Sequence, residues 1–344
     1  MYYHIIEASK DIYLYFNVTT YQLFISSPSE DIYQIISPKV KITDYTIAFF
    51  YGDCIYNLNI NSNNVLIKYR KKSDEKLVKY QVISEHDYYV ASKPCDRYKI
   101  FCEGLVYKKY LTKCIFNYNT NDCEFNIIRE YFPITKEIIE LNNYCDFNKM
   151  KKLLFWVADT IGHNGQSSLP QKRDAISLYK YAINNKYKLN CRGLAILLCE
   201  LCLSIGLKAR YIVCSQKELK YTDSHVVTIC YDSTLKKWIY LDPCYKMYLT
   251  NSKGNTILSL KEFKEYIYEN KVIQVNKEAN CDGKPLDLNI FTNTMIKKLY
   301  KYSSPMDIYI GMDNDRDSNM IYLVPDENNY PDLNCTSDYE GFWD

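Results

Sequence analysis

A cysteine, a histidine and an aspartate in the second half of the sequence have the residue types and surroundings for covalent chemistry. Cys191 follows Asn190 at the start of a long apolar stretch, and asparagine is a favoured helix N-cap, so we expect Cys191 in the first turn of a helix. The free N–H groups and positive dipole end of that turn stabilise a thiolate and can also bind an oxyanion. This position predicts a nucleophilic thiol; the alternative is that Cys191 is one buried cysteine among 14.

His225 and Asp242 begin and end two stretches of β-forming residues. If these form a hairpin, a loop over residues 233–234 and one over residues 232–235 give the same register, with His225 directly opposite Asp242. Their Cβ atoms would then lie roughly 5 Å apart, close enough for the carboxylate to orient the imidazole. Pro243 ends the strand, so the pair is expected at the rim of the sheet. The alternative is an ordinary surface His–Asp pair.

The elements that must hold these residues are readable from hydrophobic periodicity. Helices are predicted over residues 150–161 behind a cap at Asp146, over 175–182, and over 190–206, where the apolar character all round indicates a buried central helix. Strands are predicted over 211–214, 226–231 and 238–241. A capping box at Ser259–Glu262 predicts a further helix start. The tail is expected to contain a helix near 295–299 and a strand at 321–324.

The first 130 or so residues differ in character. Short runs of β-formers, such as residues 12–16, 46–51 and 65–69, are separated by turn-forming Asn, Asp, Ser and Gly. This pattern predicts an antiparallel β domain, with a sandwich as one arrangement. We therefore expect a β-rich N-terminal domain at 1–135, a catalytic core at 136–290 and a C-terminal extension packing on the core at 291–344.

Three separated motifs occur in order: Cys191 heading its helix, which ends in Gly206-Leu-Lys-Ala-Arg210; His225-Val-Val; and Trp238-Ile-Tyr-Leu-Asp-Pro243. Together they resemble the transglutaminase-like superfamily over about residues 145–270, including its bacterial standalone proteins. The resemblance implies an α+β fold: a papain-like core, in which a helix bundle carrying the nucleophile packs on an antiparallel sheet, with the β-rich domain before it. Leu207-Lys208 replaces the family's usual Ile-Pro and touches no catalytic position.

By this resemblance Cys191 is the nucleophile, His225 the general base and later the acid, and Asp242 the group that orients the imidazole. The thiolate would attack an amide or ester carbonyl of a protein or peptide substrate to give a thioacyl-enzyme, which water or an amine resolves. Hydrolysis is favoured over cross-linking, because water is the default acceptor and no feature of the sequence indicates an amine tunnel.

The loop Gly162-His163-Asn164-Gly165-Gln166 follows the first core helix. A histidine on a Gly-flanked loop could line the cleft, and Gln166 could donate to an oxyanion. A plain helix terminus and turn is the alternative, so neither residue is placed in the triad.

Composition excludes several classes of function. The 43 basic and 41 acidic residues give a net charge of +2, which offers no electrostatic reason to bind nucleic acid or an anionic membrane. Residues 1–7 do not read as a secretory signal and no apolar run could span a bilayer, so a cytoplasmic location with reduced thiols is expected. The sequence does not indicate an oligomeric state.

No cofactor or metal is expected. Cys199-x-x-Cys202 lies inside the apolar helix without a second pair, so both thiols should be core side chains. Asp313–Asp317 resembles the start of a calcium loop but lacks the required Gly and Glu, so it is predicted to be a turn.

Three other functions stay open. A glycanase removing N-glycans would be expected to carry a zinc-binding Cys-x-x-Cys set, which the sequence lacks. An acyl-CoA-dependent amine transferase should bind acetyl-CoA saturably. A catalytically silent binding module, using the fold only for partner recognition, is the alternative from another class.

Overall fold

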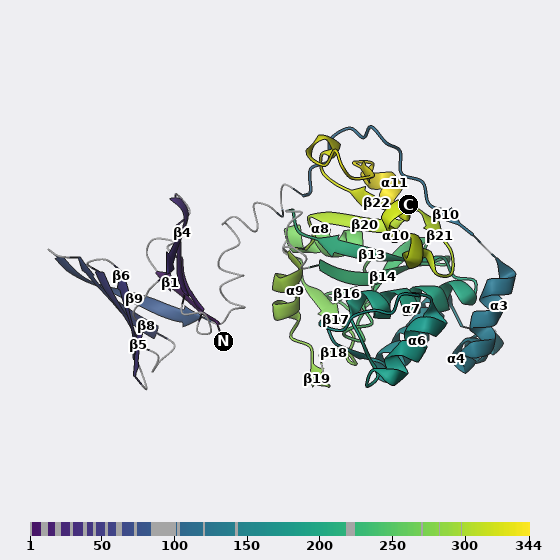
Figure 1. The fold of residues 1–344 in the computed structure, drawn as a ribbon, viewed down its shortest axis with the longest axis horizontal. Coiled ribbons are helices and arrows are strands. Elements are labelled where there is room, and N and C mark those ends of the chain that lie inside the picture. Colours follow the sequence, from purple (N-terminus) through teal and green to yellow (C-terminus); the bar gives the residue numbers. More distant parts are fainter. Residues whose placement is uncertain are drawn as a thin grey trace. The chain divides into compact units, whose positions relative to one another are not determined.

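The structure, a computed structural model, describes two separate units, Met1–Lys99 and Ile100–Asp344. In the first it describes the backbone of the strands between residues 2 and 83, and in the second residues 101–344 except 102–103, 120, 142–143, 218–223, 270, 282 and 297. The side chains of 289 and 293 are also outside this description. Figure 1 shows the element labels used below.

The first unit is a nine-stranded antiparallel sheet in the order β4-β3-β2-β1-β9-β8-β7-β6-β5. Its strands are β1 (Tyr2–Glu7), β2 (Tyr13–Asn17), β3 (Gln22–Ser27), β4 (Glu30–Ile36), β5 (Val40–Thr43), β6 (Thr46–Tyr51), β7 (Cys54–Asn59), β8 (Asn64–Lys71) and β9 (Asp74–Ile83). Strands next to each other in the chain pair as hairpins, except that β4 and β5 lie at opposite edges, and β1 also pairs with β9. The short β-forming runs therefore predicted the strands, which form one sheet rather than two packed sheets.

The second unit is built on a six-stranded sheet in the order β15-β14-β13-β20-β22-β23. Its strands are β13 (Ala209–Ser215), β14 (Ser224–Asp232), β15 (Lys237–Leu241), β20 (Lys301–Pro305), β22 (Met320–Leu323) and β23 (Cys335–Thr336). All neighbours are antiparallel except β22 and β23. The last residues of the chain thus supply three strands of the sheet, and β20 pairs directly with β13.

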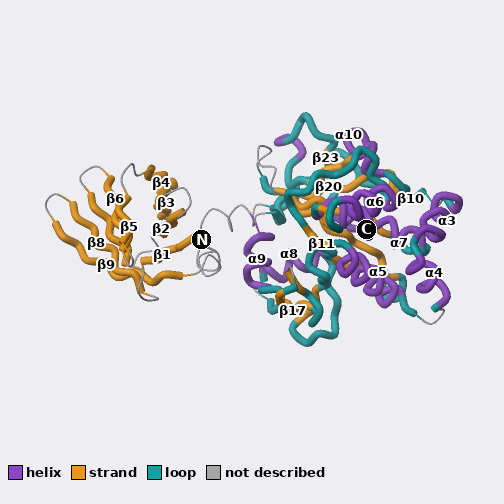
Figure 2. The backbone as a smooth tube through the Cα atoms, turned by 60° about the horizontal axis from the view of Figure 1, so that its bottom comes forward, coloured by secondary structure: helices purple, strands orange, loops and turns teal. Residues whose placement is uncertain are grey.

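A central helix, α7 (Cys191–Ser204), packs on β13 and β14. Its residues from Gly193 to Ser204 are all buried, as its apolar sequence predicted. The Thr228 hydroxyl of β14 donates to the Ala195 carbonyl oxygen at 2.9 Å, which fixes helix against sheet. Three helices pack against α7, namely α3 (Asp122–Tyr131), α5 (Asp146–Thr160) and α6 (Ala175–Asn184), and α4 (Pro133–Glu140) packs outside them against α3 and α5 (Figure 2).

The helix ends follow the capping residues in most cases. Asn190 caps α7, since its Oδ1 accepts the Gly193 N–H at 3.0 Å. Helix α8 (Leu260–Tyr268) begins with the predicted Ser259–Glu262 capping box. The prediction of a cap at Asp146 was wrong: Cys145 is the N-cap of α5, and the Asp146 carboxylate instead accepts the Ser233 N–H at 3.0 Å.

The predicted register of the β14–β15 hairpin was also wrong. Tyr231 pairs with Trp238 and Thr228 with Leu241, a shift of two residues along β15. The turn covers residues 233–236, instead of 233–234 or 232–235, and Asp232 Oδ1 accepts the N–H groups of residues 234 and 235. Because side chains alternate with a period of two, an even shift leaves each of them on its expected face.

The remaining elements are short. Three strand pairs are β10 (Asn117–Tyr118) with β21 (Asp307–Ile308), β11 (Gly162–His163) with β12 (Lys188–Leu189), and β16 (Leu249–Asn251) with β17 (Ile273–Val275). A hairpin of β18 (Asn280–Cys281) and β19 (Lys284–Pro285) leads into α9 (Leu288–Ile296), which begins earlier than the predicted tail helix. The tail also contains η1 (Met312–Asp315), α10 (Arg316–Asn319), η2 (Glu327–Asn329) and α11 (Tyr339–Trp343). Across the described residues, each helix is too short or too polar to cross a bilayer.

Candidate active site

Cys191 is the first residue of α7 and is half-buried. The start of the helix is held closely: a Cβ on Gly193 would come within 2.8 Å of the Leu169 side chain and 3.3 Å of the Leu189 side chain. Asn190 adds a second tether, because its Nδ2 donates to the Ser167 carbonyl oxygen at 2.8 Å. Cap, glycine and tether together fix the position of the thiol at the positive end of the helix dipole.

His225 and Asp242 form a buried hydrogen-bonded pair, with Nε2 of the ring 2.7 Å from Oδ2 of the carboxylate. Asp242 directly follows Leu241, the last paired residue of β15. The chain then reverses, and Asp242 pairs with Met247 in an antiparallel bridge. Its carboxylate also accepts the Tyr240 hydroxyl at 2.9 Å and the Cys244 N–H at 3.1 Å. These bonds hold the carboxylate so that it orients the imidazole, and they leave Nδ1 to face the thiol.

The Cys191 thiol is held in its ionised form by its neighbours. Burial opposes ionisation, but hydrogen bonds from His163 and His225, the charge of His225 and the Val226 N–H together lower the pKa of Cys191 to about 5. At neutral pH the sulfur is therefore a thiolate, the reactive form of cysteine.

The His225 ring is held in its protonated form. Burial alone would lower the pKa of His225, but the charge and hydrogen bond of Asp242, followed by the bond and charge of Cys191, raise it to about 10. Cys191 and His225 therefore form a thiolate–imidazolium pair between about pH 5 and pH 10.

Of the two loop candidates, the structure brings one to the thiol. His163 lies in β11, whose parallel pairing with β12 sets it opposite Leu189, two residues before Cys191, and its side chain helps to lower the pKa of the thiol. Gln166 is exposed, and its N–H donates to Asn164 Oδ1 at 3.1 Å. In the described part of the chain, no hydrogen bond joins the Gln166 side chain to the other candidate residues.

An ionic network that sequence reasoning missed anchors α7 to the C-terminal tail. The fully buried carboxylate of Asp313 accepts Arg192 at 2.8 Å, Arg173 at 3.1 Å and the Tyr211 hydroxyl at 2.7 Å. The segment predicted as a simple turn is thus a 3-10 helix whose aspartate binds the residue next to Cys191. No local signal marks this role, because the partners come from distant parts of the sequence.

His225, Asp242 and Cys244 form a cluster whose ligating atoms lie within 4.8 Å of one another, the one such group among the residues described. A cation there would have to displace the hydrogen bond between His225 and Asp242. The arrangement therefore suits proton transfer by the imidazole better than metal binding.

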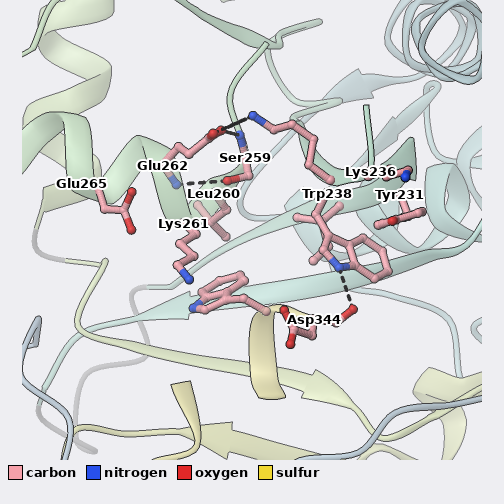
Figure 3. A pocket seen from close by; sticks show the side chains of 12 residues that line it. Tyr231, Lys236, Trp238, Ser259, Leu260, Lys261, Glu262, Glu265 and Asp344 are labelled. Carbon is pink, nitrogen blue, oxygen red and sulfur yellow. Dashed lines mark hydrogen bonds and ion pairs between the residues drawn. The ribbon is translucent and has the colours of Figure 1, made fainter. Parts of the chain in front are cut away.

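Described residues of the second unit line a cavity without a candidate residue and a cavity with one. One, of about 680 Å³, is lined by residues of β14, β15 and α8 with Trp343 and Asp344, and contains none of Cys191, His225 and Asp242. Figure 3 shows the charged side chains of its lining, including Lys261, Glu262 and Glu265. Glu262 also forms an ion pair with Lys237. The other, of about 450 Å³, is lined by His225 itself.

Comparison with known proteins assigns the fold. Residues 135–243 match the model of the transglutaminase-like superfamily, and this segment contains Cys191, His225 and Asp242. The chain thus carries a transglutaminase-like domain, as the resemblance of its motifs indicated, in an α+β unit in which the helix carrying Cys191 packs on a largely antiparallel sheet.

Similar solved structures come from bacteria and fish. A protein from Cytophaga hutchinsonii, provisionally assigned as a cysteine protease, is 16% identical, with 75% of each chain covered and a TM-score of 0.28. A protein from Parabacteroides distasonis, provisionally assigned as a protease, is 11% identical, with 60% of this chain and 36% of the other covered and a TM-score of 0.24. The transglutaminase of red sea bream is 9% identical, with 92% of this chain and 59% of the other covered and a TM-score of 0.30. No curated protein matches the sequence significantly.

Proposed function

We propose that the protein is a cysteine enzyme that transfers acyl groups from amide bonds of proteins or peptides through a thioacyl-enzyme. The observation that carries this proposal is the arrangement of three groups: the ring of His225 is near enough to Cys191 to lower the pKa of its thiol, and Nε2 of the same ring lies 2.7 Å from Asp242 Oδ2. A thiolate next to an imidazolium supplies both the nucleophile and the acid that acyl transfer needs.

The reaction uses the pair twice. The Cys191 sulfur attacks the amide carbonyl carbon, forming a C–S bond; the C–N bond then breaks as His225 gives its proton to the leaving amine nitrogen. In the second half, neutral His225 takes a proton from water or an amine, which attacks the thioester carbon and releases the thiolate. Asp242 stabilises the imidazolium that is present at the start and end of each turnover.

The oxyanion formed in each half needs hydrogen-bond donors. The N–H of Cys191 has no acceptor within its helix, because it lies in the first turn. We assign the second donor to His163 rather than Gln166, because His163 lies opposite Leu189, two residues before Cys191, and acts on the pKa of the thiol that the carbonyl must approach.

Water is the proposed acceptor, so the activity is that of a peptidase or amidase. Formation of the thioacyl-enzyme releases ammonia or a new amino terminus whichever acceptor follows, so a casein assay must follow the acyl product. Hydrolysis leaves a new carboxyl group at the cleaved amide, whereas transfer attaches an added fluorescent primary amine there. Amine incorporation that exceeds the formation of new carboxyl groups would overturn hydrolysis while leaving the thioacyl mechanism in place.

The thiol itself is tested by alkylation with iodoacetamide at pH 6 and mapping of the adducts. Cys123 and Cys145 are exposed and serve as internal references. Cys191 has far more thiolate at this pH, but a thiolate of low pKa is a weaker nucleophile, so we expect it to react roughly tenfold faster or more.

This advantage should disappear in a His225→Ala variant, because the imidazolium that stabilises the thiolate is gone. Slow alkylation of Cys191, at the rate of the exposed references, would instead favour the catalytically silent binding module.

A further inference from the structure

The cavity of about 450 Å³ beside His225 is walled by a part of the chain outside the superfamily match. Its lining comes from His225, Tyr245 and the segment from Cys281 to Lys298, whereas the match ends at residue 243. The β18–β19 hairpin and α9, which both lie outside the matched segment, thus form one wall of the cavity next to the catalytic imidazole.

The wall is mainly apolar. Phe291 and Met295 are one helical turn apart on α9 and are both buried. The Phe291 ring lies 6.5 Å from the His225 ring and 5.4 Å from the Tyr245 ring, between centroids. The lining is completed by apolar and charged side chains that include Pro285, Leu286, Ile290, Lys284 and Asp287.

The position of the cavity relative to the reacting atoms decides what it can bind. It is lined by His225 and not by Cys191. The acyl group is bonded to the sulfur, whereas the leaving amine receives its proton from the imidazole. A cavity on the imidazole side therefore faces the amine part of the substrate, provided that the thioacyl mechanism proposed above holds.

We propose that this cavity binds a large apolar side chain, aliphatic or aromatic, on the residue that contributes the amine of the amide bond. Its volume lies within the range of about 300–1,000 Å³ found for small-ligand sites, and such sites are largely apolar with a few polar groups. The enzyme then prefers amide bonds followed by a residue such as leucine or phenylalanine, and α9 is the element that selects it.

The test runs the second half-reaction with amines in place of water, because the same amine site is used in both directions. p-Nitrophenyl acetate acetylates Cys191: the C–S bond forms, the C–O bond breaks and p-nitrophenolate leaves. L-Phenylalaninamide, L-leucinamide or glycinamide is then supplied at equal free-base concentration. Its nitrogen forms the new C–N bond, the C–S bond breaks and His225 takes the proton.

The measured quantity is the N-acetylated amide formed per acetylated Cys191, so differences in acetylation between variants cancel. We expect the phenylalanine and leucine amides to exceed glycinamide roughly tenfold or more, because burial of a large apolar side chain is favourable. Equal yields from the three amides in the wild-type protein would overturn the inference.

Two matched variants locate the preference. Ile290 lines the cavity and is 54% exposed, and Ile139 of α4 is 43% exposed and does not line it. Ile290→Asp should reduce the ratio of phenylalaninamide to glycinamide product toward one, and Ile139→Asp should retain it. A ratio unchanged in Ile290→Asp would overturn the assignment to this cavity.

Failure of the underlying mechanism gives a different result. In that case p-nitrophenyl acetate leaves no acetyl group on Cys191 of the wild-type protein, and the proposed function falls together with this inference. Acetylation of Cys191 followed by indifference to the amine removes the inference alone.

Discussion

Two cysteines of the same helix, Cys191 and Cys199, have opposite acid–base properties. Burial raises the pKa of both thiols. At Cys191, hydrogen bonding by His163 and His225 and the charge of His225 outweigh burial and lower the pKa to about 5. At Cys199 burial is complete and the nearby Cys202 and Glu200 add to it, so the pKa rises well above 9.

The difference shows that the position along α7, rather than the residue type, decides whether a thiol is reactive. The first turn of the helix has N–H groups without a partner inside the helix and lies near the start of β14, where His225 is located. The second half of the helix packs into the core. A thiolate is stabilised only at the first of these positions.

The largest expected effect tests the difference between Cys191 and Cys199 directly. Cys191→Ala should abolish turnover of the casein substrate, a loss of roughly 10⁴-fold or more, because no other group supplies the nucleophile. Cys199→Ala should retain turnover and lose about 1 kcal/mol of unfolding free energy from the small gap left in the core. Steady-state rates and urea unfolding measure the two quantities. Residual turnover in Cys191→Ala, beyond that of an empty-vector preparation, would refute the assignment.

The pairing of His225 with Asp242 was reachable from the sequence although the predicted register was not. The turn covers residues 233–236, instead of 233–234 or 232–235, yet the shift of β15 is even, so both residues kept their face. Asp242 then reaches the ring from a diagonal position. The two side chains meet although the predicted register was wrong, because histidine and aspartate on one face can also reach a diagonal neighbour on the next strand.

Other parts of the site were less accessible. The Gly-flanked loop made His163 a candidate for the cleft, but its place beside the thiol depends on the pairing of two-residue strands, and Asp313 reaches Arg192 from the C-terminal tail. Both contacts depend on how distant segments pack, for which a local pattern of residues carries no signal. The fold itself was more accessible, because the α7 cap, the α8 capping box and strands β13, β14, β15 and β22 are encoded by neighbouring residues, although β20 and β23 were not predicted.

The second largest effect is expected from Asp242, whose carboxylate sets the protonation of the His225 ring beside Cys191. Asp242→Asn removes the charge that raises the pKa of His225, so the imidazolium should lose its proton at lower pH. The basic limb of the pH–rate profile, expected near pH 10, should move toward neutrality, and kcat should fall by about 10²–10⁴-fold.

A matched control comes from Asp232 on the same strand pair, which is also buried but accepts only turn N–H groups. Asp232→Asn is expected to keep the position of both limbs, whatever it does to stability. A basic limb that stays near pH 10 in Asp242→Asn would show that the carboxylate does not set the protonation of the ring.

The smallest effect is expected from His163, the second histidine that lowers the pKa of Cys191. His163→Phe removes one hydrogen bond to the thiol, so the pKa of Cys191 should rise above about 5, and the acid limb of alkylation by iodoacetamide should move to higher pH. As an oxyanion donor His163 should also support kcat, and we expect a loss of about 10–10³-fold. Gln166→Ala is the control from the same loop and should move neither quantity. A shift of the acid limb without loss of kcat would limit His163 to stabilising the thiolate, because only the loss of kcat reports on an oxyanion contact.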